Sequence, residues 1–522
     1  MAINNLNYHS YFSLSNGQPH DTFTSDEVAV FNSSQFDSGD VGAVTEGTPG
    51  FSLLTNGKIR CLVPGTYIIM YCVPLIVTGA FANAEAVTRL KKNGTTVFTQ
   101  SGPAVFVRDD PKDSIGHVIV EIDRGDLIEL TMEAVDADSI GVVRGAVINF
   151  IKLNGLYSNA HYTADADVQA DDVYKIFDDE EGGTVATETN GVTYTSSNGQ
   201  FSPDTTRKFI ILSTQTMGVD VSLIDTLRHK IIVGGSDSEV VTFACRSSID
   251  PFCHTVAYAL EVANTSNVRI EVDDSASNGE DYTIKQGTCL SLIDVSNSGT
   301  DPGAFLSFTT TTTSNEFSTT SGEKDIFDQD NYPSSTLNKT DRLTASNITY
   351  SASNGRFTVS RPGDYLILLS LTISDATTTG HSSAQIKINK NDTLYYQKTF
   401  HTDSGHDPHG KFIPIIIRAE ADDYFNFIVN NLGGKLNGDG QQITIIKLNN
   451  VAGSRRIRAQ EEASTQIGDD FTINSFKADV FDKQFDRVEN SKPPFSRGQL
   501  GPRNLRGRTT SYDVSLGGKT KK

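Results

Sequence analysis

A segment that begins with Asn-Gly recurs three times along the chain, and this internal repeat constrains the fold more than any other feature. The first copy reads NGKIRCLVPGTYIIM from Asn56, and the third reads NGRFTVSRPGDYLIL from Asn354. The second copy, NGQFSPDTTRKFIIL from Asn198, keeps the Asn-Gly pair but has no Pro-Gly pair. Each copy runs through a short alternating strand, turns, and enters a second strand at an aromatic residue. The repeat therefore predicts three domains of one fold.

Features on either side of the repeat recur in the same order. A segment carrying Phe precedes each copy, at 28–31, 173–177 and 325–327. A tight turn follows the first and third copies, at 90–95 and 386–393, and an apolar segment closes each domain, at 147–154, 287–295 and 443–449. Short alternating strands with a turn signal roughly every 8 to 12 residues are typical of sandwiches and jelly rolls. The predicted fold class is all-β, with three tandem antiparallel jelly-roll sandwiches and an extended C-terminal arm.

The strand after the third Pro-Gly pair indicates how such a domain packs. Alternate residues share a face of a strand, so one face is built from Tyr365, Ile367, Leu369, Leu371 and Ile373. The opposite face holds Leu366, Leu368, Ser370 and Thr372. Both faces are apolar at first, and the second becomes polar at Ser370. We expect a central strand of a sandwich whose far end is apolar on one side only.

The ordered set of motifs carries a resemblance to a known family. Asn-Gly-x-Phe, Pro-Gly-x-Tyr before an apolar strand, a Lys-Asn-Gly turn, RGDLIEL from Arg124 and a closing Ile-rich strand are similar to the jelly roll of complement globular heads and tumour-necrosis-factor-like ligands. The first domain matches along most of its length and the third nearly as well, whereas the second matches in order and spacing. The resemblance implies trimers, because this jelly roll packs three copies around an axis. Tandem sandwiches also resemble structural proteins of tailed phages.

The repeat predicts domain boundaries as well. Jelly roll 1 spans 1–154, a divergent jelly roll 2 spans 155–297, jelly roll 3 spans 298–450, and an extended basic anchoring arm spans 451–522. The polar residues 155–171 are expected to connect the first two domains, and the Thr- and Ser-rich residues 308–315 are expected to bridge to the third.

The arm differs from the rest of the chain in charge. Residues 451–522 hold 14 Lys and Arg against 9 Asp and Glu, a net charge of +5, and subtraction from the whole chain leaves residues 1–450 at −25. Such an arm suits acidic protein partners, including virion proteins. Nucleic acid is not expected, because only Phe495 and Tyr512 follow Lys492 as aromatic residues that could stack on bases. The predicted partner-binding residues are Arg455, Arg456, Arg458, Arg497, Arg503, Arg506, Arg508, Lys519, Lys521 and Lys522.

The sequence contains no recognisable catalytic motif, so we predict no enzyme activity and no cofactor. One cluster could hold a divalent metal, with imidazoles at His401, His406 and His409 around two carboxylates. A loop with solvent-exposed histidines is the other interpretation. The five cysteines have no Cys-x-x-Cys spacing, which indicates buried thiols rather than disulfides or a zinc site.

These observations favour a virion structural protein, a trimeric capsid-associated fibre or decoration protein anchored by its arm. The N-terminus does not read as a secretory signal and no apolar run approaches ~20 residues, so we expect synthesis in the host cytoplasm and no membrane contact. The expected partners are two further copies of the chain and other virion proteins, and a host surface receptor is left open. The alternatives left open are a receptor-binding tail fibre, a bacterial surface adhesin, and an enzyme built on the His401 cluster.

Overall fold

The computed structural model describes β-strands joined by turns, together with the short 3-10 helices η2 (Ser196–Asn198) and η4 (Gln329–Asn331). Residues 1–451 form one compact unit, called the body below, and residues 452–522 form a second. The structure describes residues 8–12, 20–23, 27–32, 46–47, 50–77, 84–105, 112–135, 140–142, 145–153, 155–168, 173–179, 183–219, 224–246, 252–274, 282–296, 305–311, 322–331, 338–343, 347–375, 381–403, 409–430, 434–436 and 439–448.

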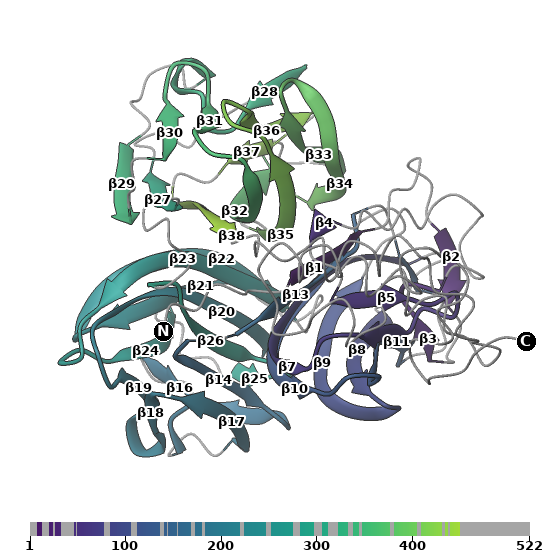
Figure 1. Ribbon diagram of the computed structural model, residues 1–522. Helices are drawn as coiled ribbons and strands as arrows, with labels where there is room; N and C mark the ends of the chain where they lie inside the picture. The colour runs from purple at the N-terminus through teal and green to yellow at the C-terminus, as the bar shows by residue number, and fades with distance from the viewer. Residues whose placement is uncertain are drawn as a thin grey trace, which may run out of the picture. The chain divides into compact units, whose positions relative to one another are not determined.

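The described strands of the body form six antiparallel sheets that follow one another in three pairs (Figure 1). The all-β jelly-roll class predicted from the sequence is therefore confirmed. Below, the first, second and third jelly rolls are the three sheet pairs in chain order, and the inner sheet of each is the one that contains its 13-residue strand.

In the first jelly roll the inner sheet has the order β2-β12-β7-β13-β1-β4, with β10 also on β7, and the outer sheet has the order β5-β6-β11-β8-β9, with β3 also on β11. The inner strands are β1 (Tyr8–Phe12), β2 (His20–Phe23), β4 (Glu46–Gly47), β7 (Gly65–Val77), β10 (Lys112–Ile122), β12 (Ile140–Val142) and β13 (Val147–Lys152). The outer strands are β3 (Val28–Ala29), β5 (Phe51–Leu53), β6 (Ile59–Cys61), β8 (Ala84–Lys92), β9 (Thr95–Val105) and β11 (Leu127–Ala134).

The second jelly roll has an inner sheet of order β15-β25-β20-β26-β14-β17, with β23 on β20, and an outer sheet of order β18-β19-β24-β21-β22, with β16 on β24. The inner strands are β14 (Tyr157–Tyr162), β15 (Ala166–Val168), β17 (Val185–Asn190), β20 (Arg207–Val219), β23 (Phe252–Val262), β25 (Tyr282–Ile284) and β26 (Cys289–Asp294). The outer strands are β16 (Tyr174–Ile176), β18 (Val192–Thr195), β19 (Gln200–Pro203), β21 (Ile224–Val233), β22 (Ser236–Arg246) and β24 (Val268–Asp274).

The third jelly roll repeats this plan, with inner order β29-β27-β38-β32-β35 plus β37 on β32, and outer order β30-β31-β36-β33-β34 plus β28 on β36. The inner strands are β27 (Phe305–Thr311), β29 (Asn338–Leu343), β32 (Gly363–Asp375), β35 (His409–Ala419), β37 (Gly434–Leu436) and β38 (Asp439–Leu448). The outer strands are β28 (Glu323–Asp325), β30 (Ile348–Ser351), β31 (Arg356–Val359), β33 (His381–Lys390), β34 (Thr393–Asp403) and β36 (Tyr424–Asn430).

The recurring Asn-Gly pair makes the same turn in each jelly roll. In the second, the side-chain oxygen of Asn198 accepts the backbone N–H of Gln200, and Gly199 has a φ of 61°. A Cβ on Gly199 would lie 2.7 Å from the carbonyl oxygen of Ile176 in the Phe-containing segment. Only glycine fits this left-handed and crowded position, which explains why the two motifs recur together. The equivalent bonds in the other jelly rolls run from Lys58 to Asn56 and from Arg356 to Asn354.

The Pro-Gly turn is held by the tyrosine that follows it. Tyr67 donates its hydroxyl to the carbonyl of Val63 at 2.6 Å, and Tyr365 donates to the carbonyl of Arg361 at 2.6 Å. The second jelly roll has Phe209 in place of this tyrosine, so its turn lacks both the Pro-Gly pair and the hydroxyl anchor. The second copy has therefore lost the Pro-Gly pair and the tyrosine that holds this turn together.

Two segments interpreted as connectors are strands. Residues 157–162 and 166–168, within the predicted connector 155–171, are β14 and β15 of the second inner sheet, and residues 308–311 of the predicted bridge belong to β27. The polar composition misled because some of these polar groups are buried in strands. Asn159 of β14 is 1% exposed and donates to Ser291 at 2.9 Å. The domain limits at 154, 297 and 450 stay predictions.

Candidate assembly interface

The outward face of the third inner sheet is not in solvent at the point where the sequence turns polar. Ser370 and Thr372 are 1% and 0% exposed, so the prediction of a strand that is apolar on one side only misjudged where these polar groups lie. The hydroxyl of Ser370 donates at 2.6 Å to the carbonyl of Thr255, which belongs to β23 of the second jelly roll. One face of β32 packs inside its own sandwich and the other packs on a neighbour.

Each jelly roll contacts the other two through one corresponding strand: β10, β23 or β35. In β10, His117 Nδ1 lies 2.8 Å from the Ser291 hydroxyl of the second jelly roll, and Asp113 lies 2.8 Å from the Lys398 ammonium of the third. In β23, the Ala259 N–H donates to Ser307 of the third jelly roll at 3.0 Å. These contacts belong to a closed set, here called the interface cycle.

The remaining contacts of the cycle involve the same kinds of strand. Gln100 of β9 donates to the Cys253 sulfur of β23 at 3.2 Å, and Asn149 of β13 donates to the Pro414 carbonyl of β35 at 2.9 Å. Strand β22 of the second jelly roll packs on β32, β35 and β38 of the third. Every pair among the three jelly rolls is therefore in contact.

The centre of the interface cycle is apolar. A single buried cluster runs from the core of the third jelly roll into both others, and its members from the first two are Ile68, Met70, Cys72, Ile115, Ile119, Val147, Ile151, Leu153, Ile210, Leu212, Cys253, Ala257, Ala259, Ile293 and Val295. Because burial of apolar surface is the main favourable term in protein association, these side chains hold the jelly rolls together, while the polar pairs set their register.

Two histidines, His117 buried and His161 partly buried, lie between the first and second jelly rolls. His117 is 1% exposed, and burial together with the charge of His161 lowers its pKa to about 3. The ring of His161 lies 5.2 Å from the ring of Phe98 across the contact, and burial lowers its pKa to about 4. Both imidazoles are neutral at pH 7.

A second histidine pair lies beside the third jelly roll. His254 packs on Gly410 of β35, where a Cβ would come within 2.1 Å of its ring, and its Nδ1 lies 3.4 Å from Nδ1 of His229. Both rings are 0% exposed, burial lowers the pKa of His254 to about 3, and burial plus the charge of His254 hold the pKa of His229 well below 6.5. Protonating both would place two like charges in contact.

One buried ion pair crosses from the third jelly roll to the first. The Lys398 ammonium contacts Asp113 at 2.8 Å, the Cys72 sulfur at 3.0 Å and the Phe412 carbonyl at 3.1 Å. Burial lowers the pKa of Lys398, but the charges of Asp113 and Cys72 and the hydrogen bonds with both groups together outweigh burial, and the pKa is raised overall. Lys411 lies 3.9 Å from the same carboxylate.

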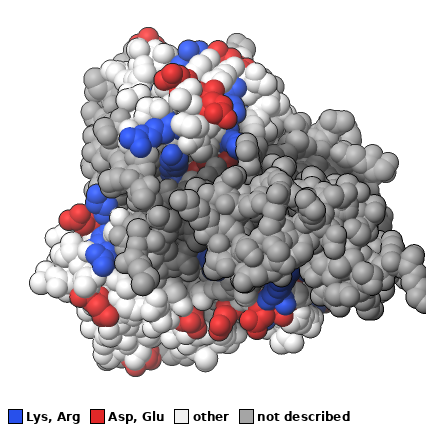
Figure 2. Space-filling view, viewed as in Figure 1, with Lys and Arg blue, Asp and Glu red and all other residues white. Residues whose placement is uncertain are grey.

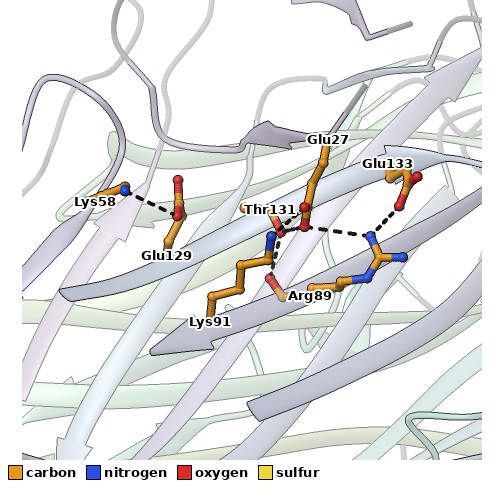
Figure 3. Close-up of polar contacts among 7 residues, drawn as sticks. All are labelled: Glu27, Lys58, Arg89, Lys91, Glu129, Thr131 and Glu133. Carbon is orange, nitrogen blue, oxygen red and sulfur yellow. Dashed lines mark hydrogen bonds and ion pairs between the residues drawn. The ribbon is translucent and has the colours of Figure 1, made fainter. Parts of the chain in front are cut away.

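The solvent side of the first outer sheet carries a network of ion pairs (Figure 3). Arg89 bridges Glu27, at 3.6 Å, and Glu133, while Glu27 also binds Lys91 and the Thr131 hydroxyl. Burial raises the pKa of Glu27, but the bonds from Lys91 and Thr131 lower it overall.

The strand registers place Lys387 and Lys230 at the position of Arg89. Lys387 pairs with Glu323, the equivalent of Glu27, at 2.5 Å, and Lys230 pairs with Asp273. A paired cation thus recurs on all three outer sheets. In the view of Figure 2, acidic and basic side chains are interspersed over the described surface.

Most of the site residues predicted from the sequence lie outside the described residues. All ten basic residues of the arm and His406 lie outside the described residues, and His401 and His409 are located only by the backbones of β34 and β35. Within the described ranges, no group of three or more His, Cys, Asp or Glu side chains is arranged to hold a metal. The part of the chain that the structure describes has no helix long and apolar enough to span a membrane.

Four of the five cysteines are placed and form no disulfide. Cys61, Cys72, Cys253 and Cys289 are free and buried, in agreement with the sequence interpretation. Burial raises the pKa of Cys72 and Cys253 to about 12, so both are thiols at pH 7.

No family model and no curated protein matches the chain. Among solved structures, parts of it are similar to tumour-necrosis-factor-family ligands, the class that the sequence motifs resemble. Murine APRIL is 17% identical, with 28% of this chain and 99% of that chain covered and a TM-score of 0.20. The Eiger TNF of S. frugiperda is 13% identical, with 28% and 93% covered and a TM-score of 0.21. Rabbit GITRL is 22% identical, with 22% and 88% covered and a TM-score of 0.17.

Proposed function

We propose that this chain is a structural protein of a virus particle, a capsid-associated decoration or fibre protein whose body is displayed and whose C-terminal arm attaches it. The observation that supports a structural role most directly is the interface cycle. Three sandwiches bury one another's inner sheets and leave outer sheets covered with paired charges, an arrangement suited to a rigid, soluble module.

The charge distribution supports attachment by the arm. The body carries a net charge of −25 and the arm +5 over residues 451–522, so the arm is the cationic segment of an otherwise acidic protein. Arginine forms bidentate pairs with carboxylates, and a Gly- and Pro-containing segment rich in arginine can follow the surface of acidic neighbours. Like-charged bodies displayed on one particle repel one another, which keeps the particles dispersed.

A homotrimer of chains remains part of the prediction. The inner-sheet faces that meet in the interface cycle are already buried within one body, so a trimer of chains would use another surface. Light scattering coupled to size exclusion distinguishes a single 56.6 kDa chain from an assembly of three.

The attachment proposal is tested by changing the charge of the arm in the full-length chain. Replacing Arg503, Arg506 and Arg508 by Gln should lower the fraction of protein that sediments with its particles, and the loss should grow with salt concentration. The matched control makes the same replacement at Arg60, Arg124 and Arg418, which are exposed on the body. Equal binding by both variants would refute attachment through the arm, and detection of the protein on cells free of virus would favour an adhesin.

A further inference from the structure

Three corresponding residues of the interface cycle differ in chemistry. Gln100, Val241 and Lys398 lie on β9, β22 and β34, and each is paired in register with the corresponding residue of the neighbouring strand, Thr88, His229 or Ile386. All three are buried, at 0% exposure. One position of the fold therefore carries an amide, an alkyl group and an ammonium.

Three positions on the facing strands also correspond, and two of them receive the side chains of Gln100 and Lys398. Asp113, Cys253 and Gly410 lie opposite Pro74, Thr216 and Thr372, each of which is nine residues after the first residue of its 13-residue strand. The first-to-second contact joins Gln100 to Cys253, and the third-to-first contact joins Lys398 to Asp113. At the second-to-third contact the corresponding residues are Val241 and Gly410, both uncharged.

These pairings are not interchangeable. The described carboxylate that pairs with Lys398 comes from the first jelly roll, and the corresponding positions of the second and third jelly rolls offer a thiol and a glycine. A fully buried ammonium without a counter-ion is strongly destabilising, and a buried carboxylate loses stabilisation when an uncharged group replaces the ammonium it pairs with. Three copies of the third jelly roll would leave Lys398 facing a glycine, and three copies of the first would leave Asp113 without the Lys398 ammonium, so neither would form as good a cycle as the three different jelly rolls do.

We propose that the pairs Gln100–Cys253 and Lys398–Asp113 match the first jelly roll to its two neighbours, so that the cycle closes inside a single chain. The Asp113–Lys398 pair closes it, because it joins the first and third jelly rolls, which are not consecutive in the sequence. The partner of each inner-sheet face is thus another part of the same molecule. This inference does not depend on a role in a virus particle.

Closure inside one chain is tested by a cross-link that uses a native cysteine. In the full-length Gln100→Cys variant, a bifunctional thiol reagent with a short spacer should join position 100 to Cys253, because the Gln100 amide lies 3.2 Å from that sulfur and the shorter cysteine side chain leaves a gap for the spacer. The expected product is a cross-link within one 56.6 kDa chain, identified by electrophoresis and peptide mapping. The Gln100→Ser variant is the control and should give no such link. Cross-linked dimers or trimers through these positions, or no link between them, would overturn the proposal.

The matching role of the ion pair is tested by a double-mutant cycle in the full-length chain. Lys398→Met removes the nearer of the two ammonium groups beside Asp113 and leaves Lys411 at 3.9 Å, and Asp113→Asn leaves Lys398 without its carboxylate, so each single variant should unfold at lower urea concentration. In the Lys398→Met/Asp113→Asn variant the loss of stability should be smaller than the sum of the two single losses. The difference should correspond to a factor of about ten or more in the unfolding equilibrium constant. Strictly additive losses would show that the pair is not coupled and would overturn its role in closure.

Discussion

The buried histidines make the stability of the body sensitive to mild acid. In the unfolded chain an imidazole has a pKa near 6.5, whereas that of His117 is about 3 in the folded chain. Between these values the unfolded state binds one more proton than the folded state, so stability falls as pH falls. The unfolding free energy that depends on a neutral His117 is present in full above pH 6.5, and roughly 2 kcal/mol of it is lost between pH 7 and pH 5. His161 and His254, with pKa values of about 4 and about 3, add similar losses.

One half-buried carboxyl opposes this trend. Burial raises the pKa of Asp325 from 3.8 to about 8, so the folded state binds the extra proton there and stability rises as pH falls through this range. Between pH 7 and pH 5 this offsets about 3 kcal/mol of the loss from the histidines. The wild-type body should therefore lose about 3 kcal/mol of unfolding free energy over these two pH units, before any further loss from His229.

The assay is urea unfolding at pH 7 and pH 5, followed by far-ultraviolet circular dichroism because the chain has no Trp. The His117→Gln variant should show about 2 kcal/mol less pH dependence than the wild type. Ser291→Ala is the matched control, since it removes the hydrogen-bond partner of His117 without removing a titrating group, and it should lower stability without removing this pH dependence. The reasoning is refuted if His117→Gln keeps the full wild-type pH dependence.

Three further predictions concern the repeat motifs and the surface. Gly199→Ala should destabilise the body by about 2 kcal/mol or more in thermal unfolding, because the new Cβ would collide with backbone atoms. The control Gly235→Ala, at a φ of 83° and with open space around the new Cβ, should cost only about 1 kcal/mol. Equal losses in the two variants would contradict the steric account. Asp126→Ala should cost about 1 to 3 kcal/mol, because the carboxylate accepts from Asn93 at 2.8 Å; an unchanged melting temperature would contradict this. Glu27→Gln should cost less than about 1 kcal/mol, and the loss should shrink in high salt; a salt-independent loss above that would show that the surface network behaves as a buried one.

Much of the repeat unit could be predicted from residues with strict local requirements. The Asn-Gly turn at Asn198 needs a side-chain acceptor followed by a residue with left-handed backbone geometry. A single copy of this motif suggests a turn, and its recurrence in three copies supports the prediction. The Gly-Asp pair at Asp126 is similar, because its carboxylate binds Asn93 of the predicted Lys-Asn-Gly turn, and hydrogen bonds, Asn93 first among them, lower its pKa. The corresponding bond in the third jelly roll runs from Asn391 to Asp423.

The interface cycle could not be predicted in the same way, because its polar residues have the composition of loops. Asn159 lies in a predicted connector and Ser370 on a face predicted to become polar, yet each is buried and bonded within or across a contact between jelly rolls. Alternation reports which residues share a face of a strand, but it does not report what covers that face. One sequence feature does indicate the contact: both faces of Tyr365–Leu369 are apolar, whereas a strand with one face in solvent normally carries polar residues on that face. A strand apolar on both faces that then acquires hydroxyls is better interpreted as a strand between two packed layers whose register is fixed by hydrogen bonds.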